Sequence, residues 1–460
     1  MNRVKRLSAA TALCAATAAA ATSTAPVAAA QERERSLLIP AAEIVAFDVL
    51  LNLFDRAVLG RDYYTDFATI RRNLSRSWVV ENDPYLINQF GHPYQGSMYH
   101  GFARSAGLGY WEALGYTVAG SAFWEIAGET TPPSWNDQIS TGFGGTFLGE
   151  SLFRLASLVL ERGNGALDTW RALAVSAISP PLAFNRRVAG RRFDTVFDSR
   201  NAPYYRRWQL GMSRTTRNER GTSTIRRPNE AIANVSLEYG LPGRPGYSYS
   251  RPFDYFTLEA MGSSATGFET ILTRGLLVGR AYEAGQRYRG LWGLYGSYDY
   301  VAPQIFRVSS TALSLGTTGQ WWLTDDVALQ GTAAAGAGYA AVGTIRAAGE
   351  RDYHYGIAPQ ALFAGRAILG QDVSLDLTAR DYFVSDVGRF DAEGNDRISR
   401  LDASVTLRLY RQNAVAIKYI WSSRDAFFPE IGHRRQVRAT IGLLYTFLGH
   451  DRFGAVEWRQ

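Results

Sequence analysis

The pattern of apolar and polar residues divides the chain into two parts with different periods. Between about residues 40 and 178, apolar residues recur every three or four positions, which predicts helices. From about residue 206 the period falls to two, which predicts strands. The expected fold class is therefore α+β, with an N-terminal helical domain followed by an antiparallel sheet.

The first predicted helix covers residues 40–58, with an apolar stripe that runs from Ile44 to Phe54. This stripe would pack against a neighbouring helix, which is the simpler expectation, or lie on a membrane surface. Residues 61–94 show no regular period. Further helices are predicted over 95–108, 111–128, 146–162 and 167–178.

Strands in the second part alternate strictly, as in Leu401–Tyr410, where Leu, Ala and Val alternate with Asp, Ser, Thr and Arg. The polar face carries charges at mid-strand, which favours lipid outside and a polar lumen inside. A closed barrel also leaves no unpaired strand edge in lipid. We expect a transmembrane β-barrel of about 12 strands, starting near residues 206, 231, 253, 267, 288, 306, 325, 355, 371, 397, 413 and 434.

The last predicted strand carries a more specific signal. Thr440, Gly442, Tyr445 and Phe447 have the spacing polar-x-Gly-x-x-aromatic-x-aromatic. This resembles the C-terminal signal read by the outer-membrane barrel assembly machinery, which is the one protein partner that the sequence implies. The signal usually ends a chain, whereas here residues 449–460 follow as a tail that folds back or hangs free.

The first thirty residues have the features of a secretory signal peptide. A basic start is followed by an Ala-rich apolar run and by Ala28-Ala29-Ala30, which fits a cleavage site. The expected domains are thus a signal peptide (1–30), a helical domain (31–200), a barrel (201–448) and a tail (449–460). The expected location is the outer membrane of a Gram-negative bacterium.

Composition narrows the function classes. The net charge of +7 includes three positive charges of the signal peptide, and no long basic run is present, so we expect no nucleic-acid partner. The single cysteine, Cys14, lies in the signal peptide, which excludes thiolate chemistry and cysteine metal sites in the mature chain. No cofactor motif is found: the glycines from Gly142 to Gly145 lack the lysine of a phosphate loop. We therefore expect no cofactor.

Most residues suited to chemistry lie between residues 82 and 150. His100 and Arg104 are four apart on one predicted helix, and Glu125 and Glu129 are four apart on the next, so a hairpin would let one pair face the other. Such a cluster would lock helices together as ion pairs, perform acid–base catalysis, or bind a metal. The candidate site residues are His92, His100, Arg104, Glu125, Glu129 and Asp137.

Three local features have simpler interpretations beside the functional ones. Pro93 predicts an extended or turn conformation at His92. Ser134 would cap a short helix through the residue three positions later, Asp137. Thr141 and the glycines after it would form an anion site at a helix N-terminus or, as the simpler expectation, allow close helix packing.

The region also resembles an uncharacterised Gram-negative envelope family, domain of unknown function 3943, over roughly residues 40–165. The matching positions include Asn88-Gln89-Phe90, His92-Pro93-Tyr94, Ala103-Arg104-Ser105, Trp124-Glu125, Asn136-Asp137, Gly144-Gly145, Gly149-Glu150 and Arg154. The resemblance implies that a barrel follows this domain in the sequence, and it implies no known activity.

Two functions remain open. The first is a structural or passage role in the cell envelope, with outer-membrane lipid around the barrel and the helical domain in its lumen or at its periplasmic mouth. The second is an envelope enzyme that modifies lipid or glycan through the His/Glu cluster.

Overall fold

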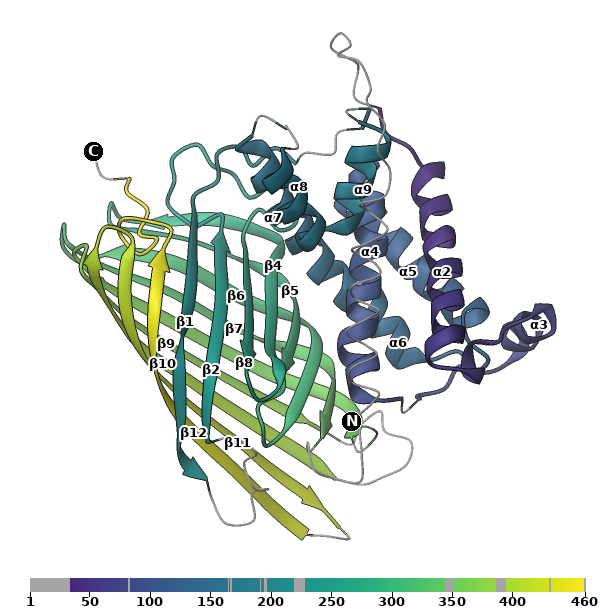
Figure 1. Cartoon of the computed structure of the whole chain (residues 1–460). Coiled ribbons are helices and arrows are strands. Elements are labelled where there is room, and N and C mark those ends of the chain that lie inside the picture. Colours follow the sequence, from purple (N-terminus) through teal and green to yellow (C-terminus); the bar gives the residue numbers. More distant parts are fainter. Residues whose placement is uncertain are drawn as a thin grey trace. The chain divides into compact units, whose positions relative to one another are not determined.

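The computed structural model describes residues 34–458 except 82, 164, 166, 167, 191, 194–196, 219–227, 344–350, 352, 386–393, 430 and 431. The expected signal peptide, residues 1–30, lies outside the described residues. The chain divides into two compact units (Figure 1). Met1–Glu81 and Leu86–Ser199 form the helical unit, and Asn82–Tyr85 and Arg200–Gln460 form the barrel unit.

All five helices expected from the sequence are present, with ends shifted by a few residues. The helical unit contains α2 (Leu38–Val58), η1 (Arg61–Tyr63), α3 (Phe67–Ser75), η2 (Ile87–Gly91), α4 (His92–Ser105), α5 (Tyr110–Ala127), α6 (Trp135–Ile139), η3 (Ser140–Gly144), α7 (Gly145–Glu161), α8 (Thr169–Ile178) and α9 (Pro180–Val188). Of these, η1 is a 3₁₀ turn, and η2 and η3 are π turns.

Two helices, α3 and α9, were not expected, and α6 is the short helix predicted after Ser134. Asp66 and Ser134 cap α3 and α6 by accepting hydrogen bonds from backbone N–H groups, and the cap at Ser134 was predicted. Pro180 and Pro181 begin α9, because proline is tolerated in the first turn of a helix. Since η3 joins α6 to α7, Trp135–Glu161 is one helical stretch, long and apolar enough to cross a membrane, although core helices of soluble proteins pass the same test.

The expected extended conformation at His92 is wrong. His92 is helical (φ −62°, ψ −47°) and its N–H donates to the Ile87 carbonyl in the π turn η2. A π turn is wider than an α turn, which makes room for the ring of Pro93 at the start of α4.

The barrel unit is a closed barrel of 12 antiparallel strands, as predicted. Each strand begins within three residues of its expected start. The strands are β1 (Tyr204–Asn218), β2 (Asn229–Tyr239), β3 (Phe256–Ser263), β4 (Gly267–Ala284), β5 (Tyr288–Val301), β6 (Arg307–Trp322), β7 (Val327–Gly343), β8 (Tyr353–Leu369), β9 (Val373–Val384), β10 (Asn395–Tyr410), β11 (Asn413–Phe428) and β12 (Gly432–Leu448).

The strands face lipid and lumen as the alternation predicted. Leu407, Leu409 and Leu443 point outward and are 44%, 68% and 61% exposed. Side chains of the opposite parity point inward, and there Asp402 accepts an ion pair from Arg400 at 3.1 Å. An apolar outer wall around a charged lumen is the arrangement of a transmembrane barrel.

The two ends of the barrel differ in their connections. At the short-turn end, four connections are only 285–287, 323–326, 370–372 and 411–412, and β1 begins and β12 ends there. The other end, the long-loop end, carries connections such as 219–228, 344–352 and 385–394. In bacterial barrels the short turns face the periplasm, which identifies the two sides.

Residues 83–85 belong to the barrel unit, although more than 100 residues separate them from the first strand in the sequence. Tyr85 contacts Tyr353 edge-on, with ring centroids 5.1 Å apart, and Arg307 lies over the Tyr85 ring at 4.5 Å. Arg307 and Tyr353 have the same parity as the outward-facing residues of their strands, such as Leu315 and Phe363. Residues 83–85 therefore run along the outer wall of the barrel, near its long-loop end.

Candidate functional site

In the helical unit, α4 packs directly on the stretch formed by α6, η3 and α7. A Cβ atom on Gly96 would lie 1.9 Å from the Thr141 carbonyl oxygen, and one on Gly149 would lie 2.9 Å from the Cβ atom of His100. The glycines therefore allow the close packing that was the simpler expectation. The alternative anion site is wrong, because Thr141 lies inside a continuous helix with no free N-terminus.

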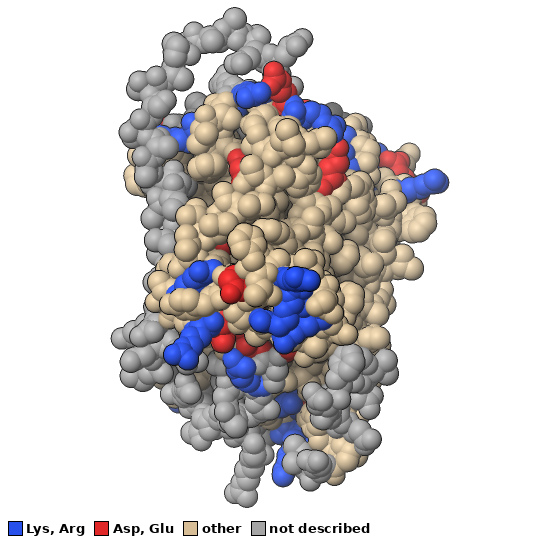
Figure 2. All heavy atoms as spheres, turned by 90° about the vertical axis from the view of Figure 1, so that its right-hand side faces the viewer, with Lys and Arg blue, Asp and Glu red and all other residues tan. Residues whose placement is uncertain are grey.

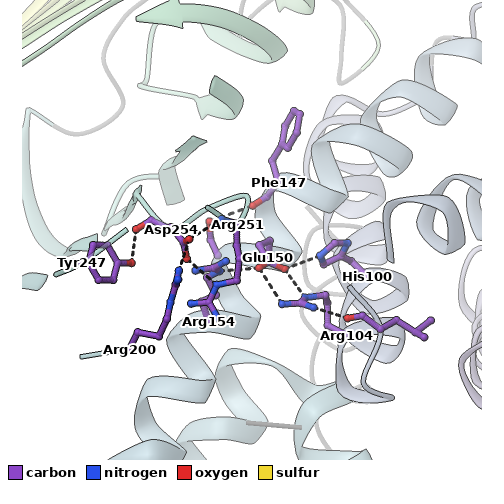
Figure 3. Close-up of polar contacts among 11 residues, drawn as sticks. His100, Arg104, Phe147, Glu150, Arg154, Arg200, Tyr247, Arg251 and Asp254 are labelled. Atoms are coloured by element: carbon purple, nitrogen blue, oxygen red, sulfur yellow. Dashed lines mark hydrogen bonds and ion pairs between the residues drawn. The ribbon is translucent and has the colours of Figure 1, made fainter. Parts of the chain in front are cut away.

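At one end of this helix pair, Glu150 is the centre of a buried ionic cluster (Figure 3). Its Oε2 atom is 3.0 Å from His100 Nε2 and 2.8 Å from Arg104 Nε. Its Oε1 atom accepts from Arg154 Nε at 2.7 Å. Glu150 and His100 are completely buried, and Arg104 and Arg154 also stack on Phe153 and Phe197.

The charges in this cluster are fixed by their neighbours. Burial alone would raise the pKa of Glu150, but Arg104, Arg154 and His100 outweigh it and hold the pKa well below its usual range. Burial lowers the pKa of His100, against the opposing effect of Glu150. Near neutral pH Glu150 is therefore ionised. It accepts hydrogen bonds that hold the helices together, and it has no proton to donate.

At the other end of the helix pair, three potential ligands converge from separate elements. Glu81 precedes η2, His92 begins α4 and Asp137 lies on α6, and one ligand atom from each lies within 4.8 Å of the others. His92 Nε2 is 3.9 Å from Asp137 Oδ1. Two carboxylates and an imidazole are a donor set that divalent transition metals accept.

More carboxylates surround this group. Glu125 accepts a hydrogen bond of 2.8 Å from the Ser134 N–H, and its pKa is raised well above the usual value by burial and by Asp137, Glu129 and Glu81. Glu129 is buried and accepts from the Trp124 indole at 2.7 Å. A raised pKa favours the protonated form of Glu125, which is the form that a general acid needs.

The six candidate residues therefore fall into two groups. His92, Asp137, Glu125 and Glu129 gather with Glu81, whereas His100 and Arg104 contact Glu150. The expectation that His100 and Arg104 face Glu125 and Glu129 is wrong, because α7, and not α5, supplies their carboxylate.

Sequence reasoning did not select Glu150, Arg154 or Glu81 as site residues. Glu150 and Arg154 stand four apart on a helix that is otherwise apolar, which is a usable signal for a buried ion pair. Glu81 had no such signal, since it follows an irregular stretch and reaches the site only through the tertiary fold.

The lumen of the barrel forms a second candidate site. A cavity of about 170 Å³ is lined by inward-facing charged residues. Arg366 contacts Glu238 at 2.6 Å and Asp376 at 2.7 Å, and Lys418 lies 3.7 Å from Glu259. The charged residues around the cavity are Arg207, Glu238, Glu259, Arg274, Arg366, Asp376, Arg380, Asp402 and Lys418.

The C-terminal tail folds into the short-turn end of this lumen, which was one of the two expectations for it. Phe453, Ala455 and Val456 are buried among inward-facing side chains that include Trp322 and Ile368. Arg366 Nη1 also donates to the Phe453 carbonyl at 3.4 Å. The tail thus packs into the mouth beside the charged cavity.

The β5–β6 connection packs into the opposite, long-loop end of the lumen. In the β5–β6 connection, Ile305 and Phe306 are completely buried in an apolar cluster with Tyr382 and Ile398. Gln304 Nε2 donates to Glu230 Oε1 at 2.6 Å. Both segments that occupy the lumen ends thus belong to the barrel unit itself.

Comparisons with known proteins agree with this division of the chain. Residues 77–181 match the family model described as "Domain of unknown function (DUF3943)". No curated protein matches the chain.

Several solved structures of outer-membrane channels and porins are similar over about half of the chain. The outer membrane channel DcaP of Acinetobacter baumannii (8% identity, TM-score 0.25) covers 54% of this chain and 96% of its own. The COG4313 outer membrane channel from Pseudomonas putida F1 (10% identity, TM-score 0.28) covers 54% and 95%. The KdgM porin in complex with oligogalacturonate (8% identity, TM-score 0.23) covers 53% and 99%.

At such TM-scores the likenesses say nothing about solute or mechanism, and the barrel rests on its own strand pairing. The resemblance found in the sequence motifs is confirmed: the chain carries a DUF3943 domain at residues 77–181, followed by a closed 12-strand barrel of the outer-membrane type.

Proposed function

We propose that the barrel is a gated passage for small polar or charged solutes across the outer membrane. In this proposal the C-terminal tail and the 302–306 loop are the gates, and both are shut in the conformation described. In this proposal they plug the lumen; the expectation for the helical domain was either that role or a position at the periplasmic mouth.

The observation that carries the proposal is the charged cavity between the tail and the 302–306 loop. A lumen with a purely structural role can be filled completely by packed and paired side chains, so it needs no open space between its charges. Apolar clusters stand at both ends, and between them paired charges line open space beside a smaller apolar cluster that includes Ile232, Met261 and Ile420. Charges in a wide lumen are what select solutes in porins and channels.

Conductance in planar lipid bilayers tests this function. A variant that lacks residues 449–460 should conduct in long openings, whereas the full chain should conduct rarely. The matched control lacks only residues 459–460 and keeps the described tail contacts, so it should behave like the full chain. Heat-dependent gel mobility checks that each variant is a folded barrel. A folded barrel that stays closed without its tail would refute the proposed gate.

The location and assembly route belong to the same proposal. Ile441, Leu443 and Tyr445 make the outer face of β12 apolar and exposed, which supports recognition of Thr440, Gly442, Tyr445 and Phe447 by the barrel assembly machinery. Cleavage of the signal peptide after residue 30 would leave Gln31 as the first residue. N-terminal sequencing of protein from outer-membrane fractions tests both points.

A second function, modification of an envelope lipid or glycan by the helical unit, is favoured by the convergence of Glu81, His92 and Asp137. These residues would hold a divalent cation, and Glu125 beside them would supply a carboxyl group for acid–base catalysis. Comparative mass spectrometry of envelope lipids from cells with wild type, Glu125→Gln or neither tests the activity. Elemental analysis of purified wild type and Asp137→Asn tests the cation separately. Identical lipid profiles would exclude lipid modification.

A further inference from the structure

On helix α2 the exposure of polar and apolar side chains is the reverse of that expected on the surface of a water-soluble protein. Its charged and amide residues are buried or half-buried, and its exposed residues are apolar. The exposed residues between Leu37 and Leu59 are all Ala, Val or Leu: Leu37, Leu38, Ala41, Ala42, Val45, Ala46, Val49, Leu50, Leu53, Ala57 and Leu59. We call this set the α2 outer face.

The polar residues of α2 are held on the inner side by specific partners. Asn52 Nδ2 donates to the carbonyls of Tyr63 (2.9 Å) and Gly128 (2.7 Å). Asp48 accepts from the Tyr99 hydroxyl. These bonds fix the rotation of the helix, so the apolar side cannot turn inward. The predicted stripe was only partly right, because Ile44 is buried while Phe47 and Phe54 stay half-buried.

The same inversion occurs on α5 and α6. On α5, Trp111 and Phe123 are 54% and 39% exposed, whereas Thr117 and Ser121 are almost completely buried. On α6, Trp135 is 52% exposed while its neighbours Asn136 and Asp137 are buried. A soluble protein scatters apolar residues singly over its surface, and a whole helix side without a charge marks contact with lipid or protein.

We propose that the α2 outer face lies on lipid, with its apolar side chains in the acyl region of the membrane that holds the barrel. The barrel supplies the first reason, since its lipid-facing wall exposes the same residue types, such as Leu315 at 66% and Leu443 at 61%. A chain anchored in a bilayer keeps that lipid at high local concentration around the rest of its surface.

The charges beside the face supply the second reason. Figure 2, which looks onto the side with α2 and α3, shows a broad uncharged area bordered by charged residues. On α3, Phe67 and Leu74 are 91% and 67% exposed, and Arg71 and Arg72 are exposed beside them. An apolar face bordered by arginines is the signature of an interfacial helix, because the arginines bind lipid phosphates.

Fluorescence quenching by lipids tests this placement in the full-length protein. The chain has one cysteine, so a Cys14→Ser background allows a single labelled cysteine at Leu53 or Val45. Labelled protein is reconstituted into phosphatidylethanolamine/phosphatidylglycerol vesicles with brominated acyl chains. Leu443→Cys on the barrel wall is the positive control, and Glu34→Cys, whose side chain is 57% exposed, is the aqueous control.

We expect the labels at Leu53 and Val45 to be quenched by brominated lipid about as strongly as the label at Leu443. The label at Glu34 should instead be quenched by aqueous iodide. Iodide quenching at Leu53 and Val45 would overturn the proposal by showing that the face is in water. Protection from both quenchers would also overturn it, by showing that a second protein surface covers the face.

Discussion

Val456 in the tail and Gln320 on β6 are joined by two hydrogen bonds. The Val456 N–H donates to Gln320 Oε1 at 2.8 Å, and Gln320 Nε2 donates to the Val456 carbonyl at 2.7 Å. The side-chain amide of Gln320 thus pairs with both backbone groups of Val456, as a neighbouring strand would. Trp322 Nε1 adds a third bond to the same carbonyl at 3.1 Å. One inward-facing glutamine therefore provides two of the hydrogen bonds that attach the tail to the barrel.

Gln320→Leu should loosen the tail without removing it. Two hydrogen bonds of about 1 kcal/mol each are lost, which corresponds to about a 30-fold higher ratio of open to closed barrel. Single-channel recording in planar bilayers measures this ratio directly. The control is Gln209→Leu, because Gln209 also faces the lumen but bonds Thr446 on the neighbouring strand. Equal opening in both variants would mean that the lumen, and not the tail, had been disturbed.

The ion selectivity of the open barrel should follow the Arg366–Glu238 pair in the cavity. Glu238→Gln removes a negative charge and should shift selectivity toward anions, and Arg366→Gln should shift it toward cations. Both changes are made in the variant without residues 449–460, and the reversal potential in a KCl gradient is the measurement. Because the two changes break the same ion pair, a shift of the same sign in both would show that the pair does not face the conducting path.

The barrel could be predicted from the sequence because lipid imposes a period on every strand. Leu401–Tyr410 shows this well: an outward Leu407 and an inward Asp402 are each required by what surrounds them. The turns between strands then fix the strand starts. No comparable sequence pattern predicts the position of the tail in the lumen, because its partners Gln320 and Trp322 are more than 130 residues away in the sequence.

The candidate site could be predicted only as a set of residue types. His100 and Arg104 were found by their spacing on one helix, but the spacing does not say which carboxylate they meet. Their partner depends on Gly96 and Gly149, which bring α7 rather than α5 against that side of α4. The exposed apolar side of α2 could not be predicted either, since a stripe does not tell whether lipid or protein lies against it.

Glu150→Gln should destabilise the helical unit strongly. The substitution removes the counter-charge that Arg104 and Arg154 share at Glu150, which costs about 3–5 kcal/mol. Protease resistance of the helical unit in increasing urea measures the loss in the full chain, while gel mobility confirms that the barrel is intact. The control, Glu112→Gln, breaks the exposed pair with Arg35 and should cost less than about 1 kcal/mol. A similar cost for both would contradict a buried, charge-locked cluster.

Asp55 on α2 should make the helical unit less stable as the pH rises. Burial raises its pKa from 3.8 to about 7, so between these values the folded unit holds a proton that the unfolded chain has released. The free energy of unfolding contributed by this group is constant below the lower value, falls by about 1.4 kcal/mol per pH unit between them, and is constant again above the upper one. Asp55→Asn has no proton to lose and should remove this slope.

The measurement is the difference in urea midpoint between Asp55→Asn and wild type at several pH values, because other groups titrate equally in both proteins. Relative to wild type, the variant should gain stability steadily from about pH 4 to about pH 7 and then no more. A difference that stays constant with pH would show that Asp55 is ionised in the folded unit. The buried side of α2 would then contain water or a counter-ion, and its outer face would have to be assigned again.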